Sequence, residues 1–71
     1  MTEIEVFVAI IDNDGFTGAA NKLKLSKSSV SKHIMALESR LGVTLLNRTT
    51  RNVRPTDIGL NYYEKCIQIL T

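Results

Sequence analysis

The sequence has 71 residues, enough for one small domain, and its hydrophobic content of 44% favours a packed core over a disordered segment. The single cysteine, Cys66, excludes an internal disulfide, and together with the single histidine, His33, it leaves a metal site short of ligands. No apolar run approaches the length of a membrane span and no signal-peptide pattern opens the chain, so we expect a cytoplasmic protein that uses no cofactor.

Charge is distributed unevenly along the chain, although the formal net charge is only +2. Residues 1–16 contain four acidic residues and no basic one, whereas residues 17–54 contain eight basic residues and a single acid, Glu38, for a net charge of +7. A basic segment of this kind is typical of a surface that binds a polyanion; the alternative interpretation is a solvated surface that happens to be basic.

The first predicted helix begins near Thr2, which with Glu5 three residues later has the form of a capping box. Apolar residues recur at helical spacing on one side of it, and a second apolar set that includes Val6 and Ile10 points to the other side. Two apolar faces are more than a surface helix of a small monomer needs. The cluster Asp-Asn-Asp-Gly at 12–15 ends this helix as a turn.

A short second helix and a longer third helix are predicted on either side of a tight break before Ser26. Thr17 can cap the second helix, and the adjacent alanines at 19 and 20 allow another helix to approach it closely. Ser26 is a good cap for the third helix, which runs over about 27–41 and is stopped by Gly42.

The third helix has two contrasting faces. At about 100° per residue, one narrow apolar stripe is formed by Val30, Ile34, Leu37 and Leu41. The opposite side, which contains no acid, carries Ser28, Ser31, Lys32, Met35 and Ser39. Each residue of this side has a second interpretation. The serines can contact DNA or be merely exposed, and Lys32 can contact a base or hold a phosphate. Met35 can touch a thymine methyl group or only be tolerated at the surface.

Two short strands, at 43–46 and 52–54, are predicted next, with a basic loop at 47–51 between them. Pro55 ends the second strand, and Thr56 caps a last helix that continues to the chain end. Polar residues share one arc of that helix, and apolar residues sweep the remaining wide arc, which is again more than one neighbour can cover.

This order of elements predicts a winged helix-turn-helix, a mainly α fold with a small β-wing: three helices, a two-stranded wing and a last helix. The third helix would fit the major groove of B-DNA with its N-terminal residues at base edges, and its free N–H groups would favour a phosphate. The loop arginines would hold the flanking backbone or a minor groove. Double-stranded DNA is therefore the expected partner.

Two other classes of function are weaker alternatives. A winged-helix module for protein–protein interaction or dimerisation would explain the excess apolar surface, but the basic middle segment argues against it as the main role. An enzyme would need a nucleophile, a base or a metal cluster, and the sequence offers none at usable spacing, so we expect no catalytic activity.

From Phe16 to Gly59, many residues follow a characteristic order without a gap. They are Ala19, Ala20, Leu23, Ser26, Val30, Ser31, Ile34, Leu37, Glu38, Leu41, Gly42, Leu45, Arg48, Thr49, Arg51, Thr56 and Gly59. In these residues the chain resembles the N-terminal domain of LysR-type transcriptional regulators, and the similarity covers essentially the whole chain. Lys27 and Ser28 differ from the residues usual in that family, so the target sequence cannot be taken from relatives.

The resemblance implies a bacterial regulator that is a homodimer or tetramer, with an effector-binding domain that is absent from this chain. It implies a DNA-binding domain over 1–57 and the start of a linker and dimerisation helix over 58–71. The base-reading residues that it implies are Lys27, Ser28, Ser31 and Lys32. The residues implied to contact the DNA backbone or to belong to the wing are Thr17, Ser26, Arg48, Thr49, Arg51 and Arg54. Those implied for dimerisation are Val6, Ile10, Leu60, Tyr63, Ile67 and Leu70.

Overall fold

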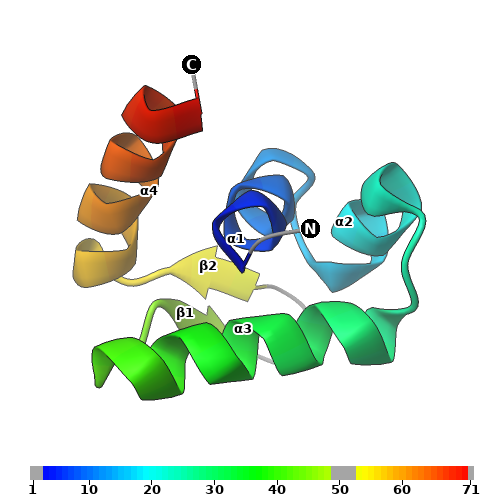
Figure 1. Ribbon diagram of the computed structural model, residues 1–71, viewed down its shortest axis with the longest axis horizontal. Coiled ribbons are helices and arrows are strands. Elements are labelled where there is room, and N and C mark those ends of the chain that lie inside the picture. Colours follow the sequence, from blue (N-terminus) through cyan, green and yellow to red (C-terminus); the bar gives the residue numbers. More distant parts are fainter. Residues whose placement is uncertain (1–2, 49–52, 71) are drawn as a thin grey trace.

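The structure is a computed structural model that describes residues 3–48 and 53–70. Its elements in chain order are α1 (Glu3–Asp12), α2 (Phe16–Leu23), α3 (Lys27–Leu41), β1 (Leu46–Arg48), β2 (Val53–Pro55) and α4 (Asp57–Leu70). Figure 1 shows α3 along one edge of the molecule, with α1 seen end-on above it and α2 and α4 on opposite sides of α1. This mainly helical arrangement with a two-stranded sheet confirms the predicted winged helix-turn-helix.

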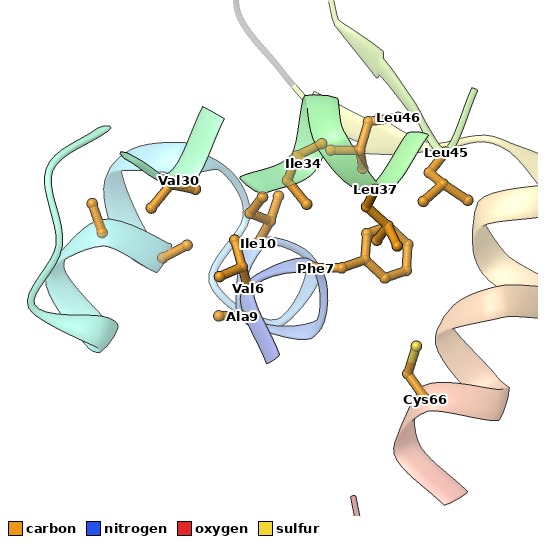
Figure 2. Packing of buried hydrophobic residues seen from close by; sticks show 12 residues of the cluster. Val6, Phe7, Ala9, Ile10, Val30, Ile34, Leu37, Leu45, Leu46 and Cys66 are labelled. Carbon is orange, nitrogen blue, oxygen red and sulfur yellow. The ribbon is translucent and has the colours of Figure 1, made fainter. Parts of the chain in front are cut away.

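The hydrophobic core is built around α1, which packs against α2, α3 and α4. Figure 2 shows the side chains of Val6, Phe7 and Ile10 converging on Ile34 and Leu37 of α3. Residues from every element except β2 complete the cluster, and they are Ala9 of α1, Ala19 and Ala20 of α2, Val30 of α3, Leu45 before the wing, Leu46 of β1 and Cys66 of α4. All of these are apolar, so burial of their surface is the main contribution to the stability of the fold.

The burial of α1 corrects one prediction. Val6 is 0% exposed and Ile10 is 1% exposed, so neither side chain is available to a second chain while the core is intact. One side of α1 is covered by α2 and α3 and another by α4, where the ring of Tyr62 lies 5.7 Å from that of Phe7. The two apolar faces of this helix are therefore satisfied within one chain, and the assignment of Val6 and Ile10 to dimerisation is wrong.

The turn between α2 and α3 and the ends of α3 follow local signals in the sequence. The Ser26 hydroxyl accepts a hydrogen bond from the Ser29 amide at 3.1 Å, and Gly42 ends α3 in the left-handed conformation, with φ 69°. Both ends were predicted correctly. The predicted cap of α2 is wrong, because α2 begins at Phe16 after Gly15, with no side-chain cap, and Thr17 already lies inside the helix.

The wing is a short antiparallel pair in which Leu46 faces Pro55, Asn47 faces Arg54 and Arg48 faces Val53. The first strand begins at Leu46, three residues later than predicted, because residues 43–45 contact α3 and the start of α4 instead of a strand. Thr49, Thr50, Arg51 and Asn52 lie outside the described residues, and with them most of the predicted basic loop.

The start of α4 is fixed against the segment that precedes the wing. The Thr56 hydroxyl caps α4 by accepting a hydrogen bond from the Gly59 amide at 2.9 Å, as predicted, and it donates to the Thr44 carbonyl at 2.7 Å. Gly59 lies so close to this segment that a Cβ atom there would stand 2.1 Å from the Leu45 carbonyl oxygen. The absence of a side chain at position 59 therefore sets the distance between α4 and the base of the wing.

Candidate nucleic-acid interface

The outer face of the first turns of α3 is the candidate binding surface. Lys27, Ser28 and Lys32 are exposed there, and Ser31 is half-buried between them. The helix begins at the Ser26 cap and is held on its inner side by Val30, so the opposite face is presented to solvent as a rigid unit. The surface lies along the edge of the molecule that α3 forms in Figure 1.

The four residues predicted to read bases share one open hollow, and an aromatic side chain joins them. The hollow has a volume of about 420 Å³ and is lined by Phe16, Lys27, Ser28, Ser31 and Lys32. Phe16 is the first residue of α2, so the hollow combines the two helices of the helix-turn-helix. Phe16 was not among the predicted site residues, although a large aromatic directly before the expected cap of α2 was the available signal.

Arg48 connects the wing to this hollow. Its guanidinium carbon lies 5.4 Å from the centre of the Phe16 ring, and its Nη2 lies 3.4 Å from Oε1 of Glu38. Both contacts stabilise the cation by interaction with a ring face and with a carboxylate. The structure thus holds the predicted wing arginine against the helix-turn-helix, while Arg54 on the neighbouring strand is exposed.

Glu38 is the residue of α3 that holds the wing. Its Oε2 accepts hydrogen bonds from the amides of Leu45 at 2.8 Å and Leu46 at 3.2 Å, while its Oε1 faces Arg48. The neighbouring cation of α3, Arg40, pairs with Glu3 of α1 instead, with 2.6 Å between Nη1 and Oε1. The signal for Glu38 was its position as the single acid of the basic segment.

Further along the outer face of α3, a methionine stands next to the hydroxyl of a predicted base reader. Met35 is 57% exposed, and the Ser31 hydroxyl donates to its sulfur at 3.9 Å. On the inner edge, His33 is half-buried, and its Nδ1 lies 2.7 Å from the Ser29 carbonyl oxygen of the preceding turn.

The residues of α4 predicted for dimerisation lie on one flank of a partly exposed helix. Leu60 and Ile67 are exposed, Tyr63 is half-buried, and the side chain of Leu70 lies outside the described part. At about 100° per residue, Ile58 and Ile69 form a second exposed apolar flank on the other side of the buried stripe. Two separate apolar strips therefore run along α4.

Two polar groups of α4 belong to its packing. Burial raises the pKa of the Cys66 thiol above its ordinary value. The Tyr63 hydroxyl donates a hydrogen bond to the Asp12 carboxylate at the end of α1, and this bond, more than burial, raises the pKa of the tyrosine. Both shifts favour the protonated group, as a packing role requires.

The described residues show neither a metal site nor a membrane-spanning helix. Within residues 3–48 and 53–70, no three His, Cys, Asp or Glu side chains come together as a metal site. In the same part of the chain, no helix combines the length and apolar character needed to cross a membrane.

A short tight turn before an outward-facing helix, followed by a two-stranded wing, defines this protein as a winged helix-turn-helix domain. The chain belongs to the LysR family of bacterial regulatory helix-turn-helix proteins, whose family model matches residues 1–60. The resemblance found in the sequence is thereby confirmed.

Known relatives are similar over nearly the whole chain. An HTH-type transcriptional regulator of Xanthomonas campestris pv. campestris is 44% identical over 64 residues, which cover 90% of this chain and 19% of the relative. The crystal structure of a BenM_DBD/catB site 1 DNA complex matches with a TM-score of 0.93 and 37% identity, over 96% of this chain and 76% of that one. The crystal structure of a CbnR_DBD–DNA complex matches with a TM-score of 0.92 and 31% identity, over 96% of this chain and 78% of that one. The chain spans about a fifth of the length of the curated relatives it matches.

Proposed function

We propose that this chain binds double-stranded DNA in a sequence-specific manner as the DNA-binding domain of a bacterial transcription regulator. The observation that carries the proposal is the acid-free outer face of α3, where two lysines and two serines converge on one open hollow. An α-helix fits the major groove, and these side chains have the lengths and donor groups that contact base edges and phosphates there. The solved DNA complexes of similar domains support the same use of this fold.

Within this proposal the residues divide by the part of DNA that they reach. Base edges are contacted by Lys27, Ser28, Ser31 and Lys32. The start of α3 at Ser26 offers free N–H groups to a phosphate, and exposed Thr17 and Arg54 reach the flanking backbone. The wing also contacts the DNA backbone or a minor groove through Arg48, which is either released from Glu38 or still paired with it. Thr49 and Arg51, which lie outside the described residues, are proposed to make contacts of the same kind.

The functional protein is proposed to be a homodimer or tetramer, in which α4 contacts a second copy and each copy binds one half-site. In this view 1–57 is the DNA-binding domain and 58–71 the start of the linker helix. The chain acts in the cytoplasm by binding and needs neither a catalytic group nor a cofactor.

A second candidate function is a protein-interaction module, favoured by the two exposed apolar strips of α4. The two functions differ in their response to salt, because neutralising phosphates releases counterions and makes affinity fall steeply with ionic strength. The test is selection of duplexes from a random pool, followed by titration of the selected duplex at 50 mM and 200 mM salt. We expect a selected consensus and a binding constant that falls by at least about tenfold between these salts. Absence of a consensus would overturn the sequence specificity. Absence of binding, or binding that ignores salt, would overturn DNA binding and leave protein interaction as the function.

A further inference from the structure

We propose that Met35 is an oxidation site through which peroxides weaken DNA binding by this domain; the proposal rests on the function proposed above. The side chain of Met35 is 57% exposed and stands on the outer face of α3, one helical turn beyond Ser31 and Lys32. Exposure gives an oxidant direct access to the thioether sulfur, and the position places any product of oxidation beside the base-reading residues.

The chemistry needs only the sulfur and a peroxide. The sulfur lone pair attacks one oxygen of hydrogen peroxide, so that an S–O bond forms while the O–O bond breaks. The sulfur loses two electrons to become the sulfoxide, and the peroxide is reduced to water. The product replaces a flexible apolar group with a polar one that carries a strong hydrogen-bond acceptor.

The contact between Ser31 and Met35 explains why oxidation of Met35 would lower the affinity for DNA. The Ser31 hydroxyl already donates to the Met35 sulfur at 3.9 Å, although a thioether is a weak acceptor. A sulfoxide oxygen on the same sulfur competes for that hydroxyl far more strongly than the thioether does, and it draws the proton of Ser31 away from a base edge. It also removes the apolar surface that Met35 offers to the groove.

The buried thiol is a poorer target for the same oxidant. Cys66 is 1% exposed within the core, and burial raises its pKa, so the reactive thiolate is scarce at neutral pH. Met35→Leu keeps Cys66 and Met1 and removes only the Met35 sulfur, at nearly unchanged volume. It is therefore the matched control for oxidation at any other residue.

The experiment treats the protein with hydrogen peroxide, locates added oxygen by peptide mass spectrometry, and measures affinity for the duplex selected by the untreated protein. We expect one added oxygen at Met35 and an affinity about three- to tenfold lower, the size of one lost hydrogen bond. Methionine sulfoxide reductase should restore the affinity, and bound duplex should slow the oxidation. Met35→Leu should have the same affinity after treatment as before it.

Ser31→Ala tests the route of the effect. Without the hydroxyl the untreated variant should bind less tightly, and oxidation should lower its affinity by a smaller factor than in the parent protein. Oxidised protein that binds as tightly as before, or a Met35→Leu variant that loses as much affinity on treatment, would overturn the proposal. Failure of the proposed function would be seen separately in the untreated protein, which would then select no duplex, and the present proposal would fall with it.

Discussion

At the scale of single residues, a substitution of Lys32 distinguishes two kinds of DNA contact by the outer face of α3: reading of a base edge and contact with a phosphate. Its side chain is exposed beside Ser28 and Ser31 and long enough to reach N7 and O6 of a guanine. We expect Lys32→Ala to weaken binding and to lower discrimination at one base pair by about 1–3 kcal/mol. Affinities of the variant for the selected duplex and for each single-base substitution of it, at fixed salt, measure both effects.

The matched control is Lys65→Ala, which removes the same charge from an exposed position of α4. It should change affinity little and leave the sequence preference intact. Uniformly weaker binding of Lys32→Ala to every duplex would make Lys32 a phosphate contact, and an equal loss in both variants would show that only net charge matters.

Residue positions that depend on distant neighbours were the hardest to predict. The contact of Phe16 with Arg48 joins residues far apart in the sequence, and no local pattern announces it. Val6 and Ile10 were recognised as apolar, but a helical pattern counts apolar faces without saying which neighbour covers them. The exposed face of α3 was predicted well at Ser28 and Lys32, because helical periodicity alone separates these two residues from the buried stripe.

At the scale of elements, the tie between α3 and the wing is concentrated in one carboxylate. Glu38→Gln keeps the shape of the side chain but removes the charge that accepts from two amides and faces Arg48. Hydrogen bonds to a charged group contribute about 1.5–3 kcal/mol when well buried, and this carboxylate is partly exposed, so we expect a loss of about 1–2 kcal/mol in the free energy of unfolding. Affinity for DNA should also fall, since the wing is then less fixed relative to α3.

Urea unfolding and duplex titration of the same Glu38→Gln sample check both expectations, with Glu64→Gln on the exposed side of α4 as control. Unchanged stability would mean that the wing is held by its packing alone.

Gly59 fixes the spacing of two other elements, α4 and the base of the wing. Inside a helix, alanine normally stabilises relative to glycine by about 1 kcal/mol. At position 59 the added Cβ would meet the Leu45 carbonyl oxygen, a backbone atom that cannot rotate away. We therefore expect Gly59→Ala to lower the free energy of unfolding by about 1–3 kcal/mol in urea titrations. A more stable variant would show that α4 can move away from the wing without cost.

Element boundaries were predictable where the signals were local and failed where they were not. The bounds of α3 agree with the prediction because both signals are local: Ser26 caps its first turn and Gly42 ends its last turn. The start of β1 was predicted too early. Residues 43–45 have strand-like composition, but their backbone groups form hydrogen bonds with Glu38 and Thr56 instead of with a second strand. Those partners lie in neighbouring elements, so strand propensity alone could not reveal them.

At the scale of the whole molecule, three groups link stability to alkaline pH. The pKa values of the Cys66 thiol and of the Tyr62 and Tyr63 hydroxyls are raised in the folded chain, so the folded state keeps protons that the unfolded state releases. Stability is then fully present below the unfolded pKa of each group and declines as pH rises through the window above it, from about pH 9 for the thiol. Urea unfolding between pH 7 and 11 should show this decline, and Tyr63→Phe should reduce its upper part. Stability that rises with pH would contradict the assignment.

The last prediction concerns which strip of α4 meets a second copy. The predicted dimer residues Leu60, Tyr63 and Ile67 lie toward one flank, while Ile58 and Ile69 lie on the other, so a substitution on each flank distinguishes the two. Leu60 is 47% exposed and Ile58 is 53% exposed, which makes Leu60→Glu and Ile58→Glu a matched pair that leaves the core untouched. We expect Leu60→Glu to abolish self-association, because a carboxylate would be buried without a partner, and Ile58→Glu to preserve it.

Sedimentation equilibrium over a range of concentrations measures association, and circular dichroism confirms that both variants stay folded. An equal loss in both variants would place the interface across the whole exposed side of α4, and loss in Ile58→Glu alone would move it to the other flank. A dimer that survives both substitutions, or none in the unaltered chain, would contradict a dimer interface on α4. Under the proposal that each copy binds one half-site, a dimer lost through Leu60→Glu should also lower affinity for a two-half-site duplex far more than for a single half-site.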